Sequence, residues 1–375
     1  MKHPSPKQVI ALYVLISLLL AACGSVPTEQ VHNAAPTASI PHTSEITIVD
    51  AQGRTVVFPE PPQRIIVAGR SSLTIIDTLF LYPEAQDRVA GLVAGRQKPG
   101  DFLDFVDPTF DQKAVLEMEA GPEQIGPLNP DVVLLRTFMA DSLGAPLEAV
   151  DIPVVYVDLE TPEQYFRDVA VLGQLLDNPA RAEEILAFYQ SKLDNVENSL
   201  ENLSDAHKPR VLVVQYSEQG GEMALNVPAA SWLQTTEAEL AGGRPVWKEA
   251  AQGGGWTVVN FEQVAAWDPD KIFVIYYQGD AAEIVDQLAT NPQWQALRAV
   301  QNGEVYGFGG DIFSWDQPDP RWILGVTWLA TKTHPDRFAN LDMRQEASEF
   351  FQQMYGLDEA TFQQHIAPQL KGDIE

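Results

Sequence analysis

The sequence has a single cysteine, Cys23, among its 375 residues. It therefore offers no pair of cysteines for an internal disulfide and no cysteine-based metal site. Its six histidines are scattered along the chain, without the close spacing typical of a multi-histidine zinc site. These absences predict a protein without a resident metal, and we expect no cofactor.

Positive charge is also scarce, because 24 lysines and arginines stand against 52 acidic residues and the formal net charge is −28. Nucleic acids and anionic lipid surfaces call for a basic face, so neither is an expected partner. The sequence has no Gly-x-Ser-x-Gly elbow, P-loop or His-Glu-x-x-His motif. We therefore expect a binding protein rather than an enzyme. A cell-surface adhesin and a carboxylate-dependent hydrolase are the alternatives from other classes.

The first 22 residues have the pattern of an export signal. Lys2 and Lys7 precede an apolar run at residues 9–20, which is too short to span a bilayer comfortably. The run ends in Leu-Ala-Ala-Cys, which resembles a bacterial lipoprotein processing box and implies cleavage before Cys23 and lipidation there. Residues 23–44 lack an apolar period and predict a flexible tether. We expect an extracytoplasmic, lipid-anchored protein; a plain signal peptide with an incidental cysteine is the alternative.

Residues 178–205 predict one long helix in the middle of the chain. Asn178 is a suitable N-cap, Pro179 fits the first helical position, and apolar residues recur on one face. A chain of 375 residues usually divides into more than one domain. We therefore expect an α/β lobe at residues 45–177 and a second α/β lobe with closing helices at 206–375, joined by this helix.

A short pattern occurs on both sides of the predicted helix. Residues 123–135 and 262–274 both begin with Glu-Gln and continue through Pro-Asp into an apolar run that predicts a buried strand. Such a repeat indicates two lobes of similar local design that face a cleft. The alternative is that a helix, a Pro-Asp turn and a strand recur here as they do in many α/β proteins.

Three segments carry a family resemblance: DAQGRTVVFPEPPQRIIVAG at 50–69, GPEQIGPLNPDVVLL at 121–135 and FSWDQPDPR at 313–321. Together they resemble the periplasmic binding proteins for iron–siderophores, cobalamin and haem, and the resemblance extends over residues 45–355. It implies two Rossmann-like α/β lobes with mainly parallel sheets, bridged by one long helix. The implied partners are the permease and ATPase subunits of an ABC importer, and we expect a monomer. We favour an iron(III)–siderophore as the ligand, with cobalamin or a molybdate or tungstate oxyanion as alternatives; haem lacks an obvious axial ligand.

Candidate ligand contacts lie on loops that follow predicted strands, where α/β lobes place their ligands. Aromatic side chains offer contact area to a large conjugated chelate, and arginine binds anionic oxygens. The predicted ligand-contact residues are Arg70, Ser71, Arg136, Trp232, Trp256, Tyr277, Trp315 and Asp316. For Trp232 and Trp256, an ordinary role in the core is the alternative.

Glu123 and Glu262 form a separate pair of candidates. Each is expected at the N-terminus of a short helix, where a carboxylate gains from the helix dipole, and this local role is one explanation for them. The resemblance implies another, in which the matching glutamate of each lobe docks onto arginines of the importer's membrane subunits. We favour docking for both residues.

Overall fold

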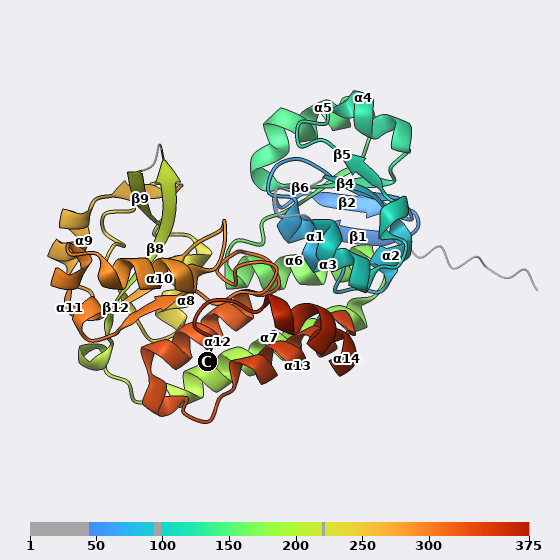
Figure 1. Ribbon diagram of the computed structural model, residues 1–375. Coiled ribbons are helices and arrows are strands. Elements are labelled where there is room, and N and C mark those ends of the chain that lie inside the picture. Colours follow the sequence, from blue (N-terminus) through green and yellow to red (C-terminus); the bar gives the residue numbers. More distant parts are fainter. Residues whose placement is uncertain (1–44, 94–98, 220–221, 375) are drawn as a thin grey trace, which may run out of the picture. The chain divides into compact units, whose positions relative to one another are not determined.

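Two β-sheets, each flanked by helices, form the framework of the described chain (Figure 1). The computed structural model describes residues 45–93, 99–219 and 222–374. The predicted signal peptide, the lipidation site Cys23 and the tether lie outside these residues. Within the described ranges, no helix is both long and apolar enough to cross a membrane.

The first sheet has five parallel strands in the order β5-β4-β3-β6-β7. All side chains of β3, β6 and β7 are buried, as expected for apolar strands covered on both faces. The strand order reverses between β3 and β6, so the carboxyl ends of these two strands border the place where α/β sheets bind ligands. The strands span Ile65–Val67 (β3), Val89–Val93 (β4), Ala114–Leu116 (β5), Val132–Arg136 (β6) and Val154–Val157 (β7).

An antiparallel hairpin precedes this sheet, and helices connect its strands. The hairpin strands are β1 (Ile46–Val49) and β2 (Thr55–Phe58). The helices are α1 (Leu73–Leu79), α2 (Glu84–Arg88), α3 (Pro99–Val106), α4 (Pro122–Ile125), α5 (Ala145–Glu148) and α6 (Pro162–Leu175). In α6, Thr161 and Gln164 form a reciprocal capping box, which fixes where the helix begins after β7.

The second sheet is mixed, and three of its five described strand pairings are parallel, in agreement with the prediction of mainly parallel sheets. Strand β12 is parallel to its neighbours β8 and β13, but β9 is antiparallel to both β8 and β11. The two residues between β8 and β9 are too few for a parallel crossover, which explains why these two strands pair antiparallel. The strands are β8 (Arg210–Gln219), β9 (Glu222–Val227), β10 (Arg244–Pro245), β11 (Thr257–Val259), β12 (Lys271–Ile275) and β13 (Val305–Gly307). The helices between them are α8 (Leu233–Leu240), α9 (Phe261–Trp267), α10 (Ala281–Thr290) and α11 (Arg298–Gln301).

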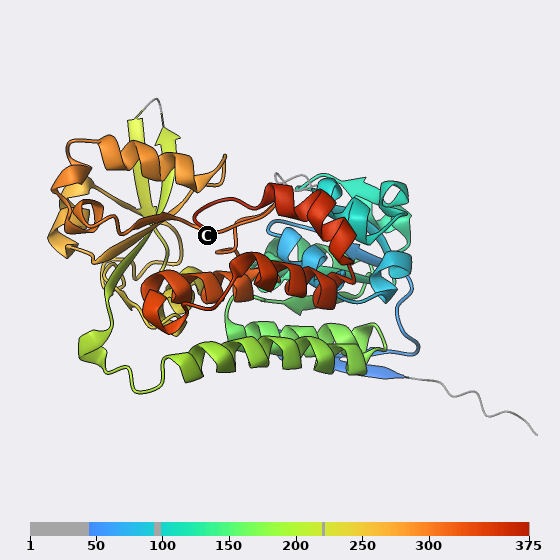
Figure 2. The same cartoon turned by 60° about the horizontal axis from the view of Figure 1, so that its bottom comes forward.

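The long helix is α7 (Pro179–Ser199), which runs beside α6 (Figure 2). Its N-cap is Asn178, as predicted, and the Asn178 side chain accepts a hydrogen bond of 3.0 Å from the Arg181 N–H. The helix ends at Ser199, earlier than predicted. Asn202 adopts a φ of 66°, a left-handed conformation that asparagine tolerates and that cannot continue a helix.

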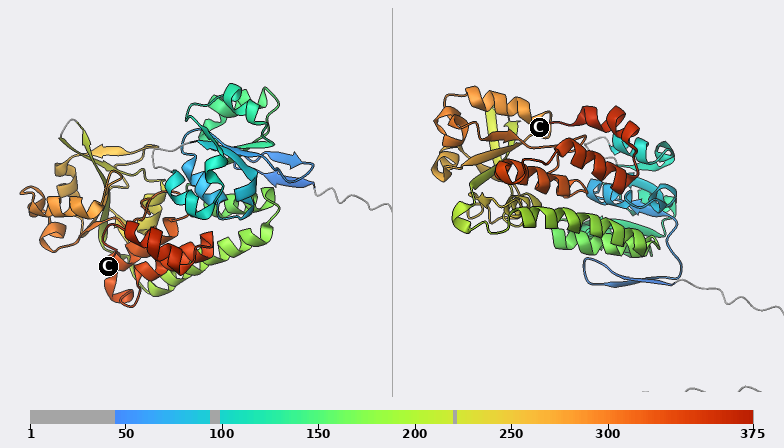
Figure 3. Two further views of the ribbon diagram at one scale, coloured as in Figure 1. Left: turned by 45° about the vertical axis from the view of Figure 1, so that its right-hand side comes forward. Right: turned by 90° about the horizontal axis from the view of Figure 1, so that it is seen from below.

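Three C-terminal helices complete the fold: α12 (Trp322–Thr333), α13 (Met343–Tyr355) and α14 (Glu359–Thr361). Helix α12 packs against α7, α8 and α13 (Figure 3). Arg181 of α7 adds a polar link, because it donates to the carbonyls of Leu81, Gln353 and Met354 at 2.8 to 3.0 Å. One guanidinium thus joins the first lobe, the long helix and the end of α13.

Candidate functional site

The loop after β3 carries the first two predicted site residues, Arg70 and Ser71, and both are exposed. Gly69 and Ser71 have left-handed φ values of 77° and 56°. A side chain on Gly69 would approach Met139 to 3.2 Å, so this turn needs a glycine. The Ser71 carbonyl accepts a hydrogen bond of 3.1 Å from the Thr74 hydroxyl, which links the turn to the start of α1.

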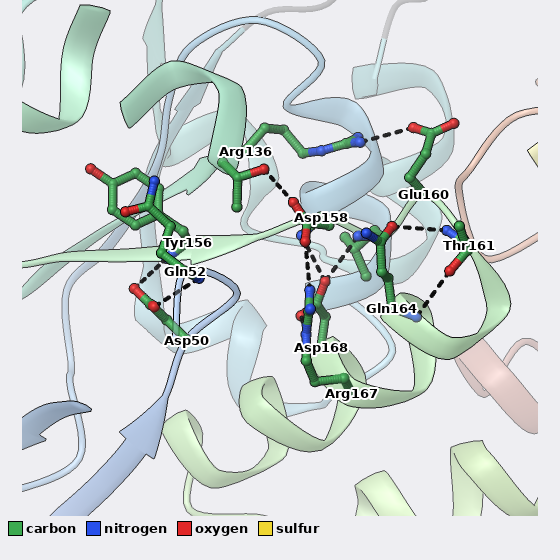
Figure 4. Close-up of polar contacts among 12 residues, drawn as sticks. Asp50, Gln52, Arg136, Tyr156, Asp158, Glu160, Thr161, Gln164, Arg167 and Asp168 are labelled. Carbon is green, nitrogen blue, oxygen red and sulfur yellow. Dashed lines mark hydrogen bonds and ion pairs between the residues drawn. The ribbon is translucent and has the colours of Figure 1, made fainter. Parts of the chain in front are cut away.

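Arg136, the last residue of β6, lies beside this turn but is buried. Its Nη1 donates to Thr74 Oγ1 at 3.0 Å. Its Nη2 donates to Glu160 Oε2, also at 3.0 Å (Figure 4). Its Nε has no hydrogen-bond partner among the described residues. A buried guanidinium needs a carboxylate partner, and Glu160 supplies it. Glu160 was not among the residues predicted from the sequence, although the loop after β7, in which it lies, is where α/β sheets carry functional side chains.

Glu160 also reaches the second lobe. The backbone N–H of Leu233, the first residue of α8, lies near enough to the Glu160 carboxylate to act on its pKa. Burial raises the pKa of Glu160, whereas Arg136 and the Leu233 N–H act to lower it. We call the chain of contacts from Arg136 through Glu160 to Leu233 the Glu160 bridge. It brings the strand ends of the first sheet next to Trp232.

Three aromatic side chains follow from there, and we call Trp232, Trp256 and Tyr277 the aromatic wall. The rings of Trp232 and Trp256 meet edge to face at 5.5 Å, and those of Trp256 and Tyr277 at 6.4 Å. All three residues are partly exposed. They come from three separate loops, so the structure brings these three predicted site residues together, and Trp232 directly precedes Leu233 in the chain.

The structure places Trp315 and Asp316 below the surface, although both were predicted as ligand contacts. Trp315 is fully buried and its indole N–H donates to Asp311 Oδ2 at 2.8 Å. Asp316 is also fully buried and accepts the Tyr277 hydroxyl at 2.6 Å and the Gln234 amide at 3.2 Å. Asp316 therefore fixes the orientation of the aromatic wall from behind, and Trp315 belongs to the core in this conformation. We leave both out of the proposed ligand surface.

A buried ion cluster lies where α12 begins. Arg321 is fully buried and contacts Asp311 at 2.9 Å, Asp77 at 2.7 Å and Asp319 at 3.9 Å. Burial raises the pKa of Asp77 to about 6, although Arg321 acts to lower it. Because Asp77 belongs to α1 and Arg321 precedes α12, the cluster ties the first lobe to the C-terminal half of the chain. No pattern in the sequence predicted this cluster.

Glu123 and Glu262 are exposed, and each is the second residue of a short helix, α4 or α9. The two helices lead into strands β6 and β12 through turns of the same construction. In the first turn, the Asp131 carboxylate accepts the backbone N–H groups of Gln63 and Arg64 at 2.8 Å. In the second turn, the Asp270 carboxylate accepts the backbone N–H of Arg210 at 2.7 Å in the same way. The left-handed residues before the Pro-Asp pairs, Asn129 and Asp268, also correspond.

Metal ligands are not gathered in the described ranges: no group of three or more histidine, cysteine or acidic side chains there could hold a metal ion. Burial lowers the pKa of His334, whose Nε2 lies 3.1 Å from the Gly242 carbonyl. This histidine therefore has a structural contact between α12 and the loop after α8.

Two α/β sheets joined by one long helix give the chain the two-lobed fold that the sequence predicted. The sequence profile of the periplasmic binding protein family matches residues 92–311, more than half of the chain. The chain therefore belongs to this family. The match confirms the family resemblance and, because this is a family of binding proteins, the expectation of binding rather than catalysis.

Individual relatives are distant but cover most of the chain. The molybdate-binding protein MolA of Haemophilus influenzae is 23% identical over 332 residues, which cover 82% of this chain and 90% of MolA. The iron-uptake system-binding protein of Bacillus subtilis is 25% identical over 301 residues, with 79% and 88% covered. Among solved structures, a periplasmic solute binding protein from Veillonella parvula has a TM-score of 0.69 at 20% identity, over 86% of this chain and 97% of that one. This likeness confirms the expected fold.

Proposed function

We propose that this protein binds an anionic iron(III)–siderophore outside the cytoplasm and delivers it to an ABC importer. The observation that carries the proposal is the connection of Arg136 to the aromatic wall through the Glu160 bridge. A guanidinium suits the anionic oxygens of a chelate, and partly exposed tryptophans offer flat contact area. A relative named for iron uptake supports this class of ligand.

A molybdate-type oxyanion is the second candidate. It is favoured by the relative named for molybdate binding and by the buried Nε of Arg136, which has no partner among the described residues. A small oxyanion would engage the arginine alone, whereas a chelate would also cover the aromatic wall. Mass spectrometry of the compound retained by the purified protein distinguishes the two candidates directly.

Replacement of Arg136 by methionine is expected to weaken the binding of ferric citrate or molybdate at least about tenfold, because a charge-assisted contact contributes about 1.5–3 kcal/mol. Quenching of tryptophan fluorescence measures the affinity. Arg64→Met is the matched control, since the exposed Arg64 lies at the opposite end of the same sheet. Equal affinity of the two variants would contradict a ligand role for Arg136.

Delivery requires contact with the membrane subunits, and we propose that Glu123 and Glu262 provide it. Both carboxylates are exposed on helices that the same turn construction holds in each lobe. A surface pocket of about 760 Å³ adjoins Glu123 and is lined in part by Val150, which is 55% exposed. An exposed apolar residue beside an exposed acid suits a protein partner better than a purely local role at the helix start.

We propose that Cys23 carries the lipid anchor that keeps the protein near the importer. Replacing Cys23 with serine should release the protein from membranes without changing its thermal unfolding, because the sequence of residues 23–44 has no apolar period from which a core could form. Membrane fractionation after a salt wash measures the release. Retention of the Cys23→Ser variant in the washed membranes would refute the anchor.

A further inference from the structure

Glu160 stands on a backbone that the fold holds in an unusual conformation. The preceding residue, Leu159, is buried and has a left-handed φ of 54°, which is costly for a leucine. The fully buried Asp168 carboxylate accepts the N–H groups of Asp158 at 2.7 Å and Leu159 at 2.9 Å (Figure 4). The position of Glu160 is therefore determined by several contacts at once, as is typical of a functional residue.

The partners of the Glu160 carboxylate are groups that bind anions. The side chain of Arg136 is 7% exposed, and its Nε has no partner among the described residues. Leu233 begins α8, so its N–H has no partner within the helix, and the N-cap residue Trp232 supplies no side-chain cap. A guanidinium and a helix start attract the same negative group.

We infer that Glu160 is an internal occupant of an anion subsite, and that a carboxylate or oxyanion group of the ligand displaces it on binding. This inference rests on the proposed function. Displacement exchanges one negative group for another, so Arg136 never faces a buried site without a counter-charge. It also releases the contact between Glu160 and Leu233, so that ligand binding and the link between the lobes become coupled.

Glu160→Gln tests the displacement, because it keeps the size of the side chain and removes its charge. When the Glu160 carboxylate occupies the subsite, the ligand must compete with it, and the apparent affinity for the ligand falls with the fraction of molecules in which the subsite is occupied. We therefore expect Glu160→Gln to bind ferric citrate or molybdate about tenfold more tightly than the wild-type protein. Glu163→Gln is the control, since Glu163 is exposed three residues further along and should leave the affinity unchanged.

A second measurement needs no ligand. Hydrogen exchange of the Leu233 amide should be at least about tenfold faster in Glu160→Ala than in the wild-type protein or in Glu163→Ala, because the variant removes the carboxylate that lies near this amide. Unchanged exchange would overturn the bridge, whatever the ligand is. If the wild-type protein binds either probe but Glu160→Gln binds it no more tightly, displacement is wrong while the proposed function stands. If neither protein binds either probe, the proposed function and the displacement fall together.

Discussion

Replacing Arg321 with methionine is expected to lower the free energy of unfolding by about 3–5 kcal/mol at pH 7, the usual cost of removing one partner from a buried ion cluster. The Arg321 guanidinium is fully buried and bonds to Asp77 and Asp311. Its Cζ atom also lies 4.4 Å from the ring centre of Phe102 and 4.8 Å from that of Phe313. Removal leaves buried carboxyl groups facing one another and separates α1 from α12.

The loss should depend on pH in a defined direction. Burial raises the pKa of Asp77 from 3.8 to about 6 while Arg321 acts to lower it, so removal of Arg321 raises this pKa further. A carboxyl group with a raised folded-state pKa adds stability that is fully present below its unfolded pKa and is lost as the pH rises through its folded pKa. Arg321→Met should therefore be closest to the wild-type protein near pH 5 and furthest from it near pH 8. Urea unfolding at the two pH values measures the difference.

Arg298→Met provides the control for this experiment. Arg298 also contacts two aspartates, Asp268 at 2.9 Å and Asp270 at 2.8 Å, but it lies at the surface. Solvent screens such pairs, so this variant should stay close to the wild-type protein at every pH. A similar loss of stability in both variants would show that burial does not make the Arg321 ion pairs more stabilising than the exposed ion pairs of Arg298.

The features that the sequence predicted correctly are those determined by neighbouring residues. Asn178 and Pro179 begin the long helix in the structure, as their capping chemistry requires. The shared Glu-Gln and Pro-Asp pattern predicted two turns of the same design, and Asp131 and Asp270 make equivalent contacts in them. Both features were predicted from short stretches of chain, although the Asp131 and Asp270 contacts themselves join residues 67 and 60 positions apart.

The parts that the sequence could not predict depend on distant pairs. Asp77 and Arg321 are 244 positions apart, and no local pattern indicates that they meet. Glu160 and Leu233 likewise come from different lobes. Trp315 was expected on the surface because it follows a strand, but the loop folds back so that its indole bonds to Asp311. Burial of such a residue is decided by the tertiary fold rather than by its neighbours in sequence.

The double variant Glu123→Lys, Glu262→Lys is expected to abolish transport while ligand affinity in solution stays unchanged. Both glutamates are exposed and lie on helices α4 and α9, not on the loops that carry Glu160 or the aromatic wall. Loss of a charged partner at an interface costs about 2–5 kcal/mol, which corresponds to a reduction of about 30-fold or more in affinity for the transporter. Reversal to lysine adds repulsion if the membrane subunits present arginines, so the double variant should be worse than either alanine variant.

Glu183→Lys, Glu197→Lys is the matched control, because it changes the net charge equally on exposed positions of α7. Transport in reconstituted membranes and binding to the importer in detergent measure docking, and fluorescence titration measures ligand affinity. If the glutamates only favour the starts of α4 and α9, the double variant should lose a little stability and transport normally. Normal transport would therefore refute docking, whereas an equal loss in the control would attribute the effect to net charge rather than to these two positions.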